Sequence, residues 1–402
     1  MTVLYLTCDY PYGPHEAFLT AEVSALRHLG LRLILVPRTP PRLAVHQDAA
    51  RHADCTVRRP LLDGGIAASA AVMVLRHPWR VFRALALIVR SHRPSVVVRN
   101  LLVLPKALWC ARLAQEEGVA HIHAQWALTT ATMAMVAGEV AGIPWSFTAH
   151  RADIVANNLL ALKVRRASWV RFISQSGLAL AQGQGVRLAG NEAVVHMGVE
   201  MPCSPVSVPA SGSHLVICPA MYLPVKGHRY LLDAVALLVA RGVPIAVWLA
   251  GSGTDGLALH DAVAERGLGG IVHLKGPVPH NLLLGEYRSG RVAAVVLPSV
   301  DLGNGEHEGI PVALMEAMAH GLPVVGTKTG GISELLHDGA GLLVPPMDPE
   351  ALADGIQRLL SDRALALETG RAGRCRIEEE FEIGSVARRL CQGMEVGFGR
   401  GS

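Results

Sequence analysis

The sequence predicts an α/β protein made of two doubly wound, Rossmann-like domains that face each other across a cleft. Short runs of β-branched and leucine residues alternate with longer helical stretches, as in parallel sheets covered by helices on both faces. The alternation stops between Met201 and Ser213, where prolines and serines interleave, and then restarts. The chain has 402 residues, half of them hydrophobic, which is enough apolar material for two cores.

The first half is expected to form an N-terminal domain over residues 1–200, followed by a linker at 201–214. Its strands are expected near residues 3–7, 33–36, 96–99, 120–123, 146–148 and 194–196, with helices between them.

The second half is expected to form a similar domain over residues 215–375. Its strands are expected near residues 215–218, 245–249, 271–274, 293–297, 324–326 and 342–344. Residues 376–402 are helical in pattern and can pack back on the N-terminal domain as a C-terminal helix.

Composition narrows the class of protein. No apolar run reaches the roughly 18 residues that a membrane helix needs, and the first residues are typical of a buried strand rather than a signal peptide. The seven cysteines are scattered without metal-site spacing. Aromatic residues make up 4% of the chain, too few for a base-stacking surface, so no nucleic-acid partner is expected. We therefore expect a cytoplasmic protein.

Two acids with seven residues between them mark the second half. Glu308 is expected on a loop, and Glu316 about one and a half turns inside the helix that follows. Pro311 suits the first turn of that helix, whose free N–H groups, those of Val312 and Ala313, favour a diphosphate. The two carboxylates can therefore contact different parts of one long ligand.

This stretch resembles the acid-x7-acid motif of the retaining family-4 glycosyltransferases, which have the GT-B fold. The resemblance extends through Pro298-Ser299, 330–334 and 339–349. It implies that Glu308 is a catalytic residue that holds the donor sugar and that Glu316 holds the nucleotide ribose. The implied donor site comprises Lys226, Arg229, Gly309, Ile310, Pro311, Val312, Ala313 and Glu316.

Lys226 matches the second member of a basic pair that neutralises the donor phosphates in similar enzymes. The first member, usually arginine, is Met221 here. Either Arg229 substitutes for it or the donor phosphate is held more weakly. No Asp-x-Asp motif accompanies this site, so no metal and no other cofactor is expected.

The first half also resembles that family, in particular the enzymes that build exopolysaccharide or colanic-acid-type units on a lipid carrier. The resemblance rests on residues 121–126 and 131–134 and on Ser146-Phe-Thr-Ala-His150. It implies that His150 faces the donor sugar as a catalytic residue, although a buried structural histidine is the alternative. Further acceptor or cleft candidates are His15, Glu16, His123 and Asp153.

A basic, amphipathic stretch spans residues 76–93. Such a helix can lie in an anionic membrane surface, with arginines at the phosphates and aromatic residues in the headgroup boundary. The alternative is an arginine-rich outer helix of the N-terminal domain. The membrane candidates are Arg76, Trp79, Arg80, Arg83 and Arg90.

Together these patterns predict a retaining glycosyltransferase that uses a nucleotide diphosphate sugar. Its acceptor is expected to be a lipid-linked saccharide in cell-surface polysaccharide synthesis, with peripheral attachment at the inner face of the membrane. Three alternatives stay open: transfer to a soluble natural product, a non-catalytic nucleotide-sugar-binding protein, and epimerase or inverting chemistry on the same fold.

Overall fold

The computed structural model divides the chain into two compact units. It describes residues 1–13, 16, 18–41, 51–61, 63–91, 93–203, 210, 212–303 and 308–399. Unit 1 comprises Met1–Gly198 and Ile383–Ser402, and unit 2 comprises Val199–Glu382. Within the expected linker, residues 204–209 and 211 lie outside the described part. No helix in the described ranges is long and apolar enough to cross a membrane.

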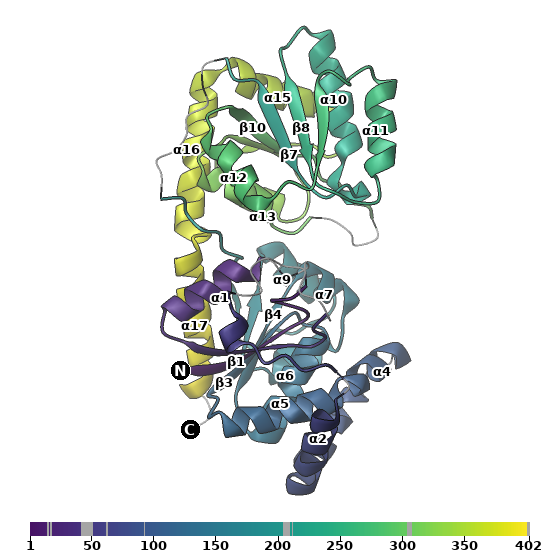
Figure 1. The fold of residues 1–402 in the computed structure, drawn as a ribbon, viewed down its shortest axis with the longest axis vertical. Helices are drawn as coiled ribbons and strands as arrows, with labels where there is room; N and C mark the ends of the chain where they lie inside the picture. The colour runs from purple at the N-terminus through teal and green to yellow at the C-terminus, as the bar shows by residue number, and fades with distance from the viewer. Residues whose placement is uncertain are drawn as a thin grey trace. The chain divides into compact units, whose positions relative to one another are not determined.

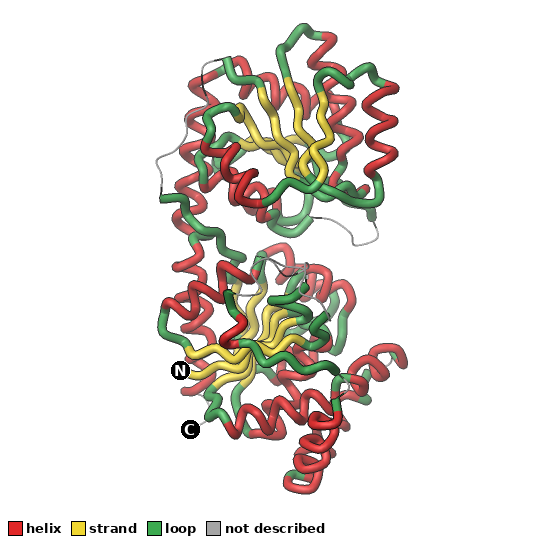
Figure 2. Tube along the Cα trace, in the orientation of Figure 1, coloured by secondary structure: helices red, strands yellow, loops and turns green. Residues whose placement is uncertain are grey.

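Unit 1 is a parallel sheet with helices on both faces (Figures 1 and 2). Its strands, in the order β2-β1-β3-β4-β5-β6, are β1 Thr2–Thr7, β2 Arg32–Pro37, β3 His121–Gln125, β4 Trp145–Ala149, β5 Trp169–Phe172 and β6 Glu192–Val194. Its helices are α1 Leu19–His28, α2 Gly64–Arg76, α3 Pro78–Ile88, α4 Pro94–Leu102, α5 Leu104–Glu116, α6 Thr129–Ala141, α7 Arg151–Ala156, α8 Leu160–Arg166, α9 Gln175–Gly183 and α17 Ile383–Gly399, with a short 3₁₀ turn at Ala53–Cys55.

The two faces of this sheet differ in chemistry because successive side chains point to opposite sides of a strand. Leu4, Ile122 and Phe147 point to one face and join the apolar core beneath α5 and α6. The alternate positions of the same strands carry polar side chains such as Tyr5 and His123, which are also fully buried. Helices α1 and α17 pack on this second side, so unit 1 encloses a polar layer as well as an apolar core.

The strand expected at residues 96–99 is wrong, because these residues lie in helix α4. The run Val96-Val97-Val98 is apolar and β-branched, but Pro94 fits the first helical turn and Val98 stays exposed, which a central strand would not allow. The sixth strand is β5, which sequence patterning missed, and the last strand ends at Val194 instead of reaching residue 196.

Unit 2 is a second parallel sheet, with the strand order β12-β11-β10-β7-β8-β9. Its strands are β7 Leu215–Pro219, β8 Ala246–Ala250, β9 Val272–Gly276, β10 Val292–Leu297, β11 Val324–Thr327 and β12 Leu342–Val344. Its helices are α10 His228–Ala240, α11 Gly256–Glu265, α12 His280–Arg288, α13 Val312–Ala319, α14 Ile332–Leu335, α15 Pro349–Ser361 and α16 Arg363–Glu380, with a 3₁₀ turn at Pro224–Lys226. All six expected strands are present.

The last helix, α17, belongs to unit 1 although 184 residues of unit 2 precede it in the chain (199–382). Its apolar side carries Val386, Leu390 and Met394, all fully buried. At Gly393 an added Cβ would lie 2.3 Å from the Trp169 ring, so this position needs glycine for the helix to approach β5. Residues 383–399 therefore complete the polar side of the first sheet.

Buried imidazoles in this layer make the stability of unit 1 depend on pH. Burial lowers the pKa of His121 to about 3, whereas histidine in an unfolded chain titrates near 6.5. The unfolded state binds more protons below that value, so the contribution of His121 to the free energy of unfolding is present above pH 6.5 and is lost as the pH falls towards 3.

We expect His121→Gln, which keeps a polar contact to Ser146, to flatten the pH dependence of stability. The slope of the free energy of unfolding between about pH 6 and 4 should fall by up to about 1.4 kcal/mol per pH unit. Urea unfolding followed by tryptophan fluorescence measures it, because five of the six tryptophans (79, 109, 126, 145 and 169) lie in unit 1 and one (248) in unit 2. An unchanged slope would contradict the assignment of a neutral, buried His121.

Candidate functional site

The candidate site of unit 2 lies where the strand order of its sheet reverses. Strands β7 and β10 are neighbours, but the chain leaves them towards opposite edges of the sheet. In open parallel sheets, ligands bind outside the carboxyl ends of the strands at such a switch point. The segment after β7 carries Lys226, and the segment after β10 carries Ser299 and Glu308.

Glu308 and Lys226 meet at this point. The Lys226 Nζ lies 2.5 Å from Glu308 Oε2, and the Ser299 hydroxyl donates to the same oxygen at 3.0 Å. Both charged side chains remain partly accessible, at 19% for the lysine and 13% for the glutamate. A cation and a carboxylate from two loops are thus held side by side and within reach of a ligand.

Glycines allow the loops around this pair to approach closely. Gly227 has φ +67°, and a Cβ there would lie 2.0 Å from the carbonyl oxygen of Pro298. The Val300 N–H donates to the Val225 carbonyl at 2.9 Å across the same junction. Gly331 similarly leaves no room for a Cβ against Ile310 and Gly309. These backbone contacts hold the Lys226 loop against the residues that follow β10, and they hold Gly331 against the residues next to Glu308.

Helix α13 begins directly after the Glu308 loop and supplies the second acid. Pro311 is its N-cap residue and provides no side-chain hydrogen bond, and the N–H groups of Val312 and Ala313 stand in the first turn, where a helix has no internal acceptor. Glu316 lies on the same helix, and its Oε1 is 2.8 Å from His280 Nε2 at the start of α12. The arrangement presents helix N–H donors between two carboxylates.

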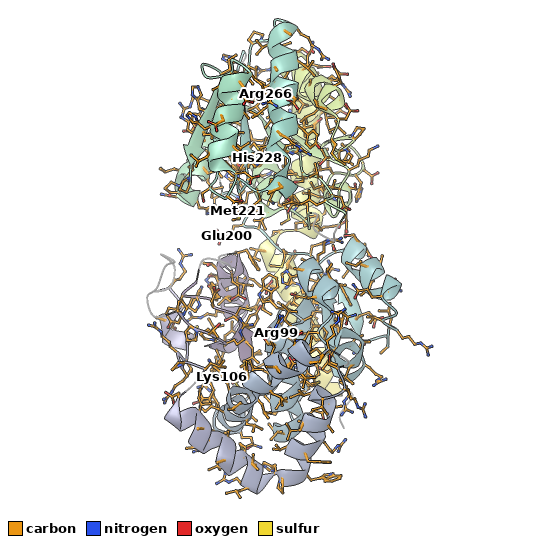
Figure 3. All side chains as sticks on the ribbon, turned by 90° about the vertical axis from the view of Figure 1, so that its right-hand side faces the viewer. Arg99, Lys106, Glu200, Met221, His228 and Arg266 are labelled. Carbon is orange, nitrogen blue, oxygen red and sulfur yellow. The ribbon has the colours of Figure 1, made fainter. Side chains whose placement is uncertain are left out.

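Met221 and Arg229, the two positions discussed as partners of Lys226, differ in their exposure and contacts. Met221 is 56% exposed on the segment after β7 (Figure 3). The Arg229 guanidinium donates to the Tyr230 hydroxyl at 2.6 Å and stacks over that ring. The neighbouring His228 is buried, and burial, with Lys226 adding to the effect, lowers its pKa to about 4.

In unit 1 the loop after β1 is fixed by Glu16. Its buried carboxylate accepts hydrogen bonds from the backbone N–H groups of Cys8, Asp9 and Tyr10 at 2.7–3.0 Å, and from the Trp126 indole. Burial raises the pKa of Glu16. Strands β1 and β3, which these loops follow, are adjacent at the switch point of the first sheet. Of the other candidates, His15 lies outside the described residues.

His150 follows β4 at the carboxyl edge of the same sheet and is 7% exposed. Its ring stacks on Trp126 with 4.1 Å between ring centroids, and its Nε2 lies 3.0 Å from Gln125 Nε2. Burial, with Arg171 adding to the effect, lowers the pKa of His150 to about 3, so the imidazole is neutral at physiological pH.

Asp153 is tied to His150 through the start of helix α7. Its Oδ2 accepts from the N–H groups of His150 at 3.1 Å and Ala127 at 2.8 Å. Burial raises the pKa of Asp153 to about 7 despite these hydrogen bonds and the nearby Lys163. A carboxyl group able to hold a proton near neutral pH therefore lies beneath the His150 backbone.

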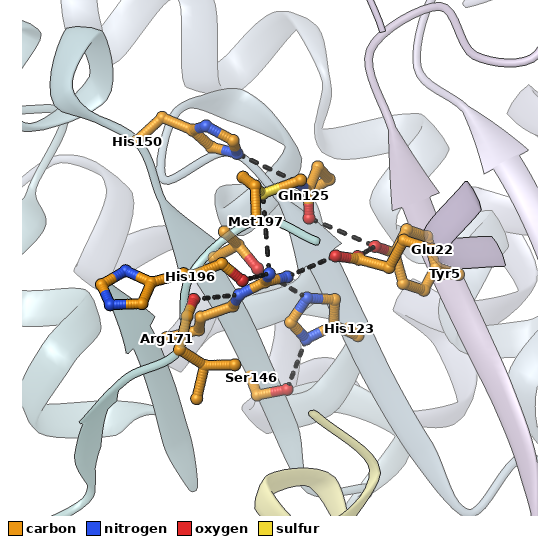
Figure 4. A network of polar contacts seen from close by, with 11 residues as sticks. Tyr5, Glu22, His123, Gln125, Ser146, His150, Arg171, His196 and Met197 are labelled. Carbon is orange, nitrogen blue, oxygen red and sulfur yellow. Dashed lines mark hydrogen bonds and ion pairs between the residues drawn. The ribbon is translucent and has the colours of Figure 1, made fainter. Parts of the chain in front are cut away.

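A buried hydrogen-bond network continues from His150 through the sheet (Figure 4). The Tyr5 hydroxyl donates to Glu22 Oε1 at 2.6 Å and lies 3.2 Å from Gln125 Oε1. Glu22 Oε2 pairs with Arg171 Nη1 at 2.6 Å, with both side chains fully buried. The network links the His150 position to the interior of unit 1.

His123 lies deeper in the sheet than His150. Its ring nitrogens contact the hydroxyl of Ser146 at 2.8 Å and that of Thr148 at 3.0 Å, and the side chain is fully buried. These contacts hold β3 to β4. The structure thus gives His123 two internal partners within the sheet.

Helices α2, α3 and α4 form a basic and apolar surface that projects from unit 1 (Figure 1). Leu75, Trp79 and Phe82 are 81%, 67% and 60% exposed, and Trp79 stacks on Phe82. No acidic residue occurs between positions 63 and 116. The exposed arginines of this surface are Arg76, Arg80, Arg83, Arg90, Arg93 and Arg99.

Arg80 differs from the other arginines of this surface. Its Nη1 donates to the Val140 carbonyl at 3.0 Å and lies against Gly142, so it also fastens α3 to the end of α6. Loss of its charge would therefore disturb packing as well as surface potential.

Three residues of the two sites escaped sequence patterning. Ser299 was recognised only as part of a motif, whereas the structure makes it a hydrogen-bond donor to Glu308. His280 had no assigned role and contacts Glu316. A signal for Arg171 was available, because Glu22 lies four residues before the apolar Leu26 on the same side of the first helix, and a buried acid requires a partner.

Most of the second unit is similar to a family of known proteins. Residues 212–362 match the family model described as "Glycosyl transferases group 1". The amylovoran biosynthesis glycosyltransferase AmsK of Erwinia amylovora is 34% identical over 171 residues, 42% of each chain. The putative colanic acid biosynthesis glycosyltransferase WcaL of Escherichia coli is 36% identical over 203 residues, 49% of each chain. The matches thus span about half or less of these relatives' length.

Solved structures resemble the whole chain at low sequence identity. Anabaena Alr3699/HepE in complex with UDP superposes with a TM-score of 0.71 at 18% identity, covering 98% of this chain and all of that chain. Sucrose-phosphate synthase from Thermosynechococcus elongatus gives a TM-score of 0.70 at 20% identity, covering both chains fully. The two parallel-sheet units therefore have the GT-B fold, and residues 212–362, which hold Lys226, Glu308 and Glu316, are similar to the glycosyltransferase group 1 family.

Proposed function

We propose that this protein is a retaining glycosyltransferase that takes its sugar from a nucleoside diphosphate sugar. The observation that carries the proposal is the contact between Lys226 and Glu308 at the switch point of unit 2, directly before the N-terminus of α13. UDP is the first nucleotide to test, because HepE has been solved with UDP and with UDP-glucose.

The geometry suits a nucleotide-sugar donor whose diphosphate, sugar and ribose contact different residues. The helix N-terminus and Lys226 meet the diphosphate, since both favour negative charge. Glu308, held by Lys226 and Ser299, is close enough to that position to accept hydrogen bonds from the sugar hydroxyls. Glu316 takes the ribose hydroxyls after exchanging its contact with His280. Departure of the nucleoside diphosphate then leaves an oxocarbenium-like sugar, which the nearby carboxylate stabilises electrostatically.

Product analysis tests this proposal. The purified protein is incubated with UDP-glucose and candidate saccharide acceptors, and the anomeric configuration of the product is determined by NMR. The proposal expects nucleotide release that depends on acceptor and an α-linked product. An inverted product would refute the retaining mechanism, and the absence of any donor binding or turnover across nucleotide sugars would refute the enzyme assignment.

Activity is expected to survive metal chelation. Lys226 and the α13 N-terminus neutralise the diphosphate without a divalent cation in this proposal. Initial rates measured with EDTA should match those measured without it. Loss of activity in EDTA that magnesium or manganese restores would contradict this expectation.

We further propose that the acceptor is a lipid-linked saccharide in the synthesis of a cell-surface polysaccharide. The relatives AmsK and WcaL are named for amylovoran and colanic acid biosynthesis. Helices α2–α4 offer exposed Trp79 and Phe82 among arginines without any intervening acid, a combination that binds anionic membrane surfaces. The enzyme would then work as a peripheral membrane protein.

Removing three arginines of this surface should weaken membrane binding. Each arginine near an anionic surface contributes about 1 kcal/mol before salt screening, so Arg76→Gln, Arg83→Gln and Arg99→Gln together should cost at most about 3 kcal/mol. Arg80 is retained because it also holds α6. Sedimentation with anionic vesicles at several salt concentrations measures the effect, with UDP affinity as the control. Equal binding by the triple variant would favour a soluble acceptor.

A further inference from the structure

A cavity of about 290 Å³ opens on unit 1 where the end of α3 meets the turn between α7 and α8. Arg90 and Arg165 line it together with Leu159, Leu162 and Asn157, and no acidic side chain is among its lining residues. We propose that this cavity binds the diphosphate of a polyprenyl-diphosphate-linked acceptor, an inference that rests on the proposed function and names the acceptor's anionic group.

Charge supports a phosphate ligand. Within the described ranges, neither Arg90 nor Arg165 has a carboxylate at ion-pair distance, whereas the neighbouring Arg166 pairs with Glu139 at 3.2 Å. Two guanidinium groups that share one cavity match a diphosphate, because each can contact phosphate oxygens in a bidentate manner. The volume exceeds what a single bound water needs and leaves room for such a group.

The turn between α7 and α8, which forms part of the cavity wall, has an unfavourable backbone conformation that several hydrogen bonds maintain. Leu159 has φ of +55°, a region that bulky non-glycine residues rarely occupy, and Asn157 before it ends α7 in the same left-handed region. Asn158 between them exchanges two hydrogen bonds with Asn100 of α4, at 2.9 and 3.0 Å. Arg93 donates to the Ala156 carbonyl at 3.2 Å. Strained residues held in this way cluster at ligand-binding positions.

The position of the cavity joins the membrane surface to the catalytic candidate. Arg90 and the exposed Val89 follow α3, which carries Trp79 and Phe82, so a lipid chain can leave the cavity along apolar surface. On the other side, α7 runs from His150 to Asn157 over six residues, about 9 Å of helix. A diphosphate in the cavity would therefore let the attached saccharide extend along α7 towards His150.

Vesicle binding with two matched double variants tests the inference. Vesicles of phosphatidylcholine containing undecaprenyl diphosphate are compared with phosphatidylcholine vesicles containing phosphatidylglycerol at the same surface potential. Arg90→Gln with Arg165→Gln removes the two cavity charges. Arg76→Gln with Arg83→Gln removes two charges from the adjoining helices and leaves the cavity intact. The thermal midpoint of unfolding shows that each variant is folded.

The wild type should bind the diphosphate vesicles about tenfold more tightly than the phosphatidylglycerol vesicles. Millimolar inorganic pyrophosphate should abolish this preference, since the recognised group is the diphosphate. The cavity variant should lose the preference, and the control variant should keep it while binding both vesicles more weakly. Equal preference in the two variants, or no effect of pyrophosphate, would overturn the inference.

Nucleotide binding separates this inference from the proposed function. A protein that binds UDP without any preference among vesicles has no diphosphate site in the cavity, although its donor site stands. A protein that keeps the preference but neither binds nor turns over any nucleotide sugar retains the cavity assignment and refutes the proposed enzyme.

Discussion

Glu308→Gln should lower turnover of a saturating donor by about two orders of magnitude or more, because it removes the negative charge next to the developing oxocarbenium-like sugar. The substitution keeps the shape of the side chain and can still accept a hydrogen bond from Ser299. The glutamine lacks the negative charge that the Glu308 carboxylate presents to Lys226. Steady-state rates with donor well above KM measure the effect on kcat separately from donor binding.

Glu350→Gln is the matched control for this substitution. Glu350 forms an exposed ion pair with Arg241 on the surface of unit 2, and such pairs contribute little. Its variant should have nearly wild-type kcat and an unchanged fold. If Glu308→Gln also turned over donor at nearly the wild-type rate, Glu308 would have no part in catalysis.

Arg171→Met should destabilise unit 1 by about 3–5 kcal/mol, because it leaves the Glu22 carboxylate buried without its cation. Arg171 also donates to the carbonyl groups of Val195 and His196, which would lose their partner. Both side chains of the ion pair are fully buried, so solvent does not screen the loss. Urea unfolding followed by tryptophan fluorescence measures the change.

Two further variants show whether the burial of the Arg171–Glu22 ion pair causes the expected loss of stability. Arg32→Met breaks the exposed pair with Glu117, whose side chains are 62% and 38% accessible, and should cost about 1 kcal/mol or less. Combining Arg171→Met with Glu22→Leu should recover part of the loss, since the uncompensated charge is then removed. A cost as small for Arg171→Met as for Arg32→Met would show that the Glu22 carboxylate finds another partner or becomes protonated.

The sequence was most informative where local pattern and burial agree. The six strands of unit 2 are short apolar runs between helices, and each forms where expected. Strand β5 was missed because Arg171 interrupts its apolar run, and α4 was mistaken for a strand because three consecutive valines favour strands locally. In both segments, contacts with the rest of unit 1 determined which secondary structure forms.

The sequence predicted which residues belong to the candidate sites but not which of them contact one another. The spacing of Glu308 and Glu316 indicated one long ligand, yet the contact of Glu308 with Lys226 depends on the adjacency of β7 and β10, which are far apart in sequence. The sequence left open whether His150 is buried, because its ring stacks on Trp126 from a different loop. Long-range pairing of this kind leaves no local pattern.

Nucleotide binding by unit 2 is the most direct test of the central claim. Calorimetric titration of the wild type with UDP in the presence of EDTA should show one site, and Lys226→Met should weaken it by about tenfold or more, since the lysine pairs with the diphosphate. Lys275 lies in strand β9, and its ammonium group lies over the ring of Trp248 in β8. The Lys275→Met variant should therefore bind UDP as the wild type does. Equal affinities in all three proteins, or no binding of UDP, ADP or GDP by the wild type, would contradict the account.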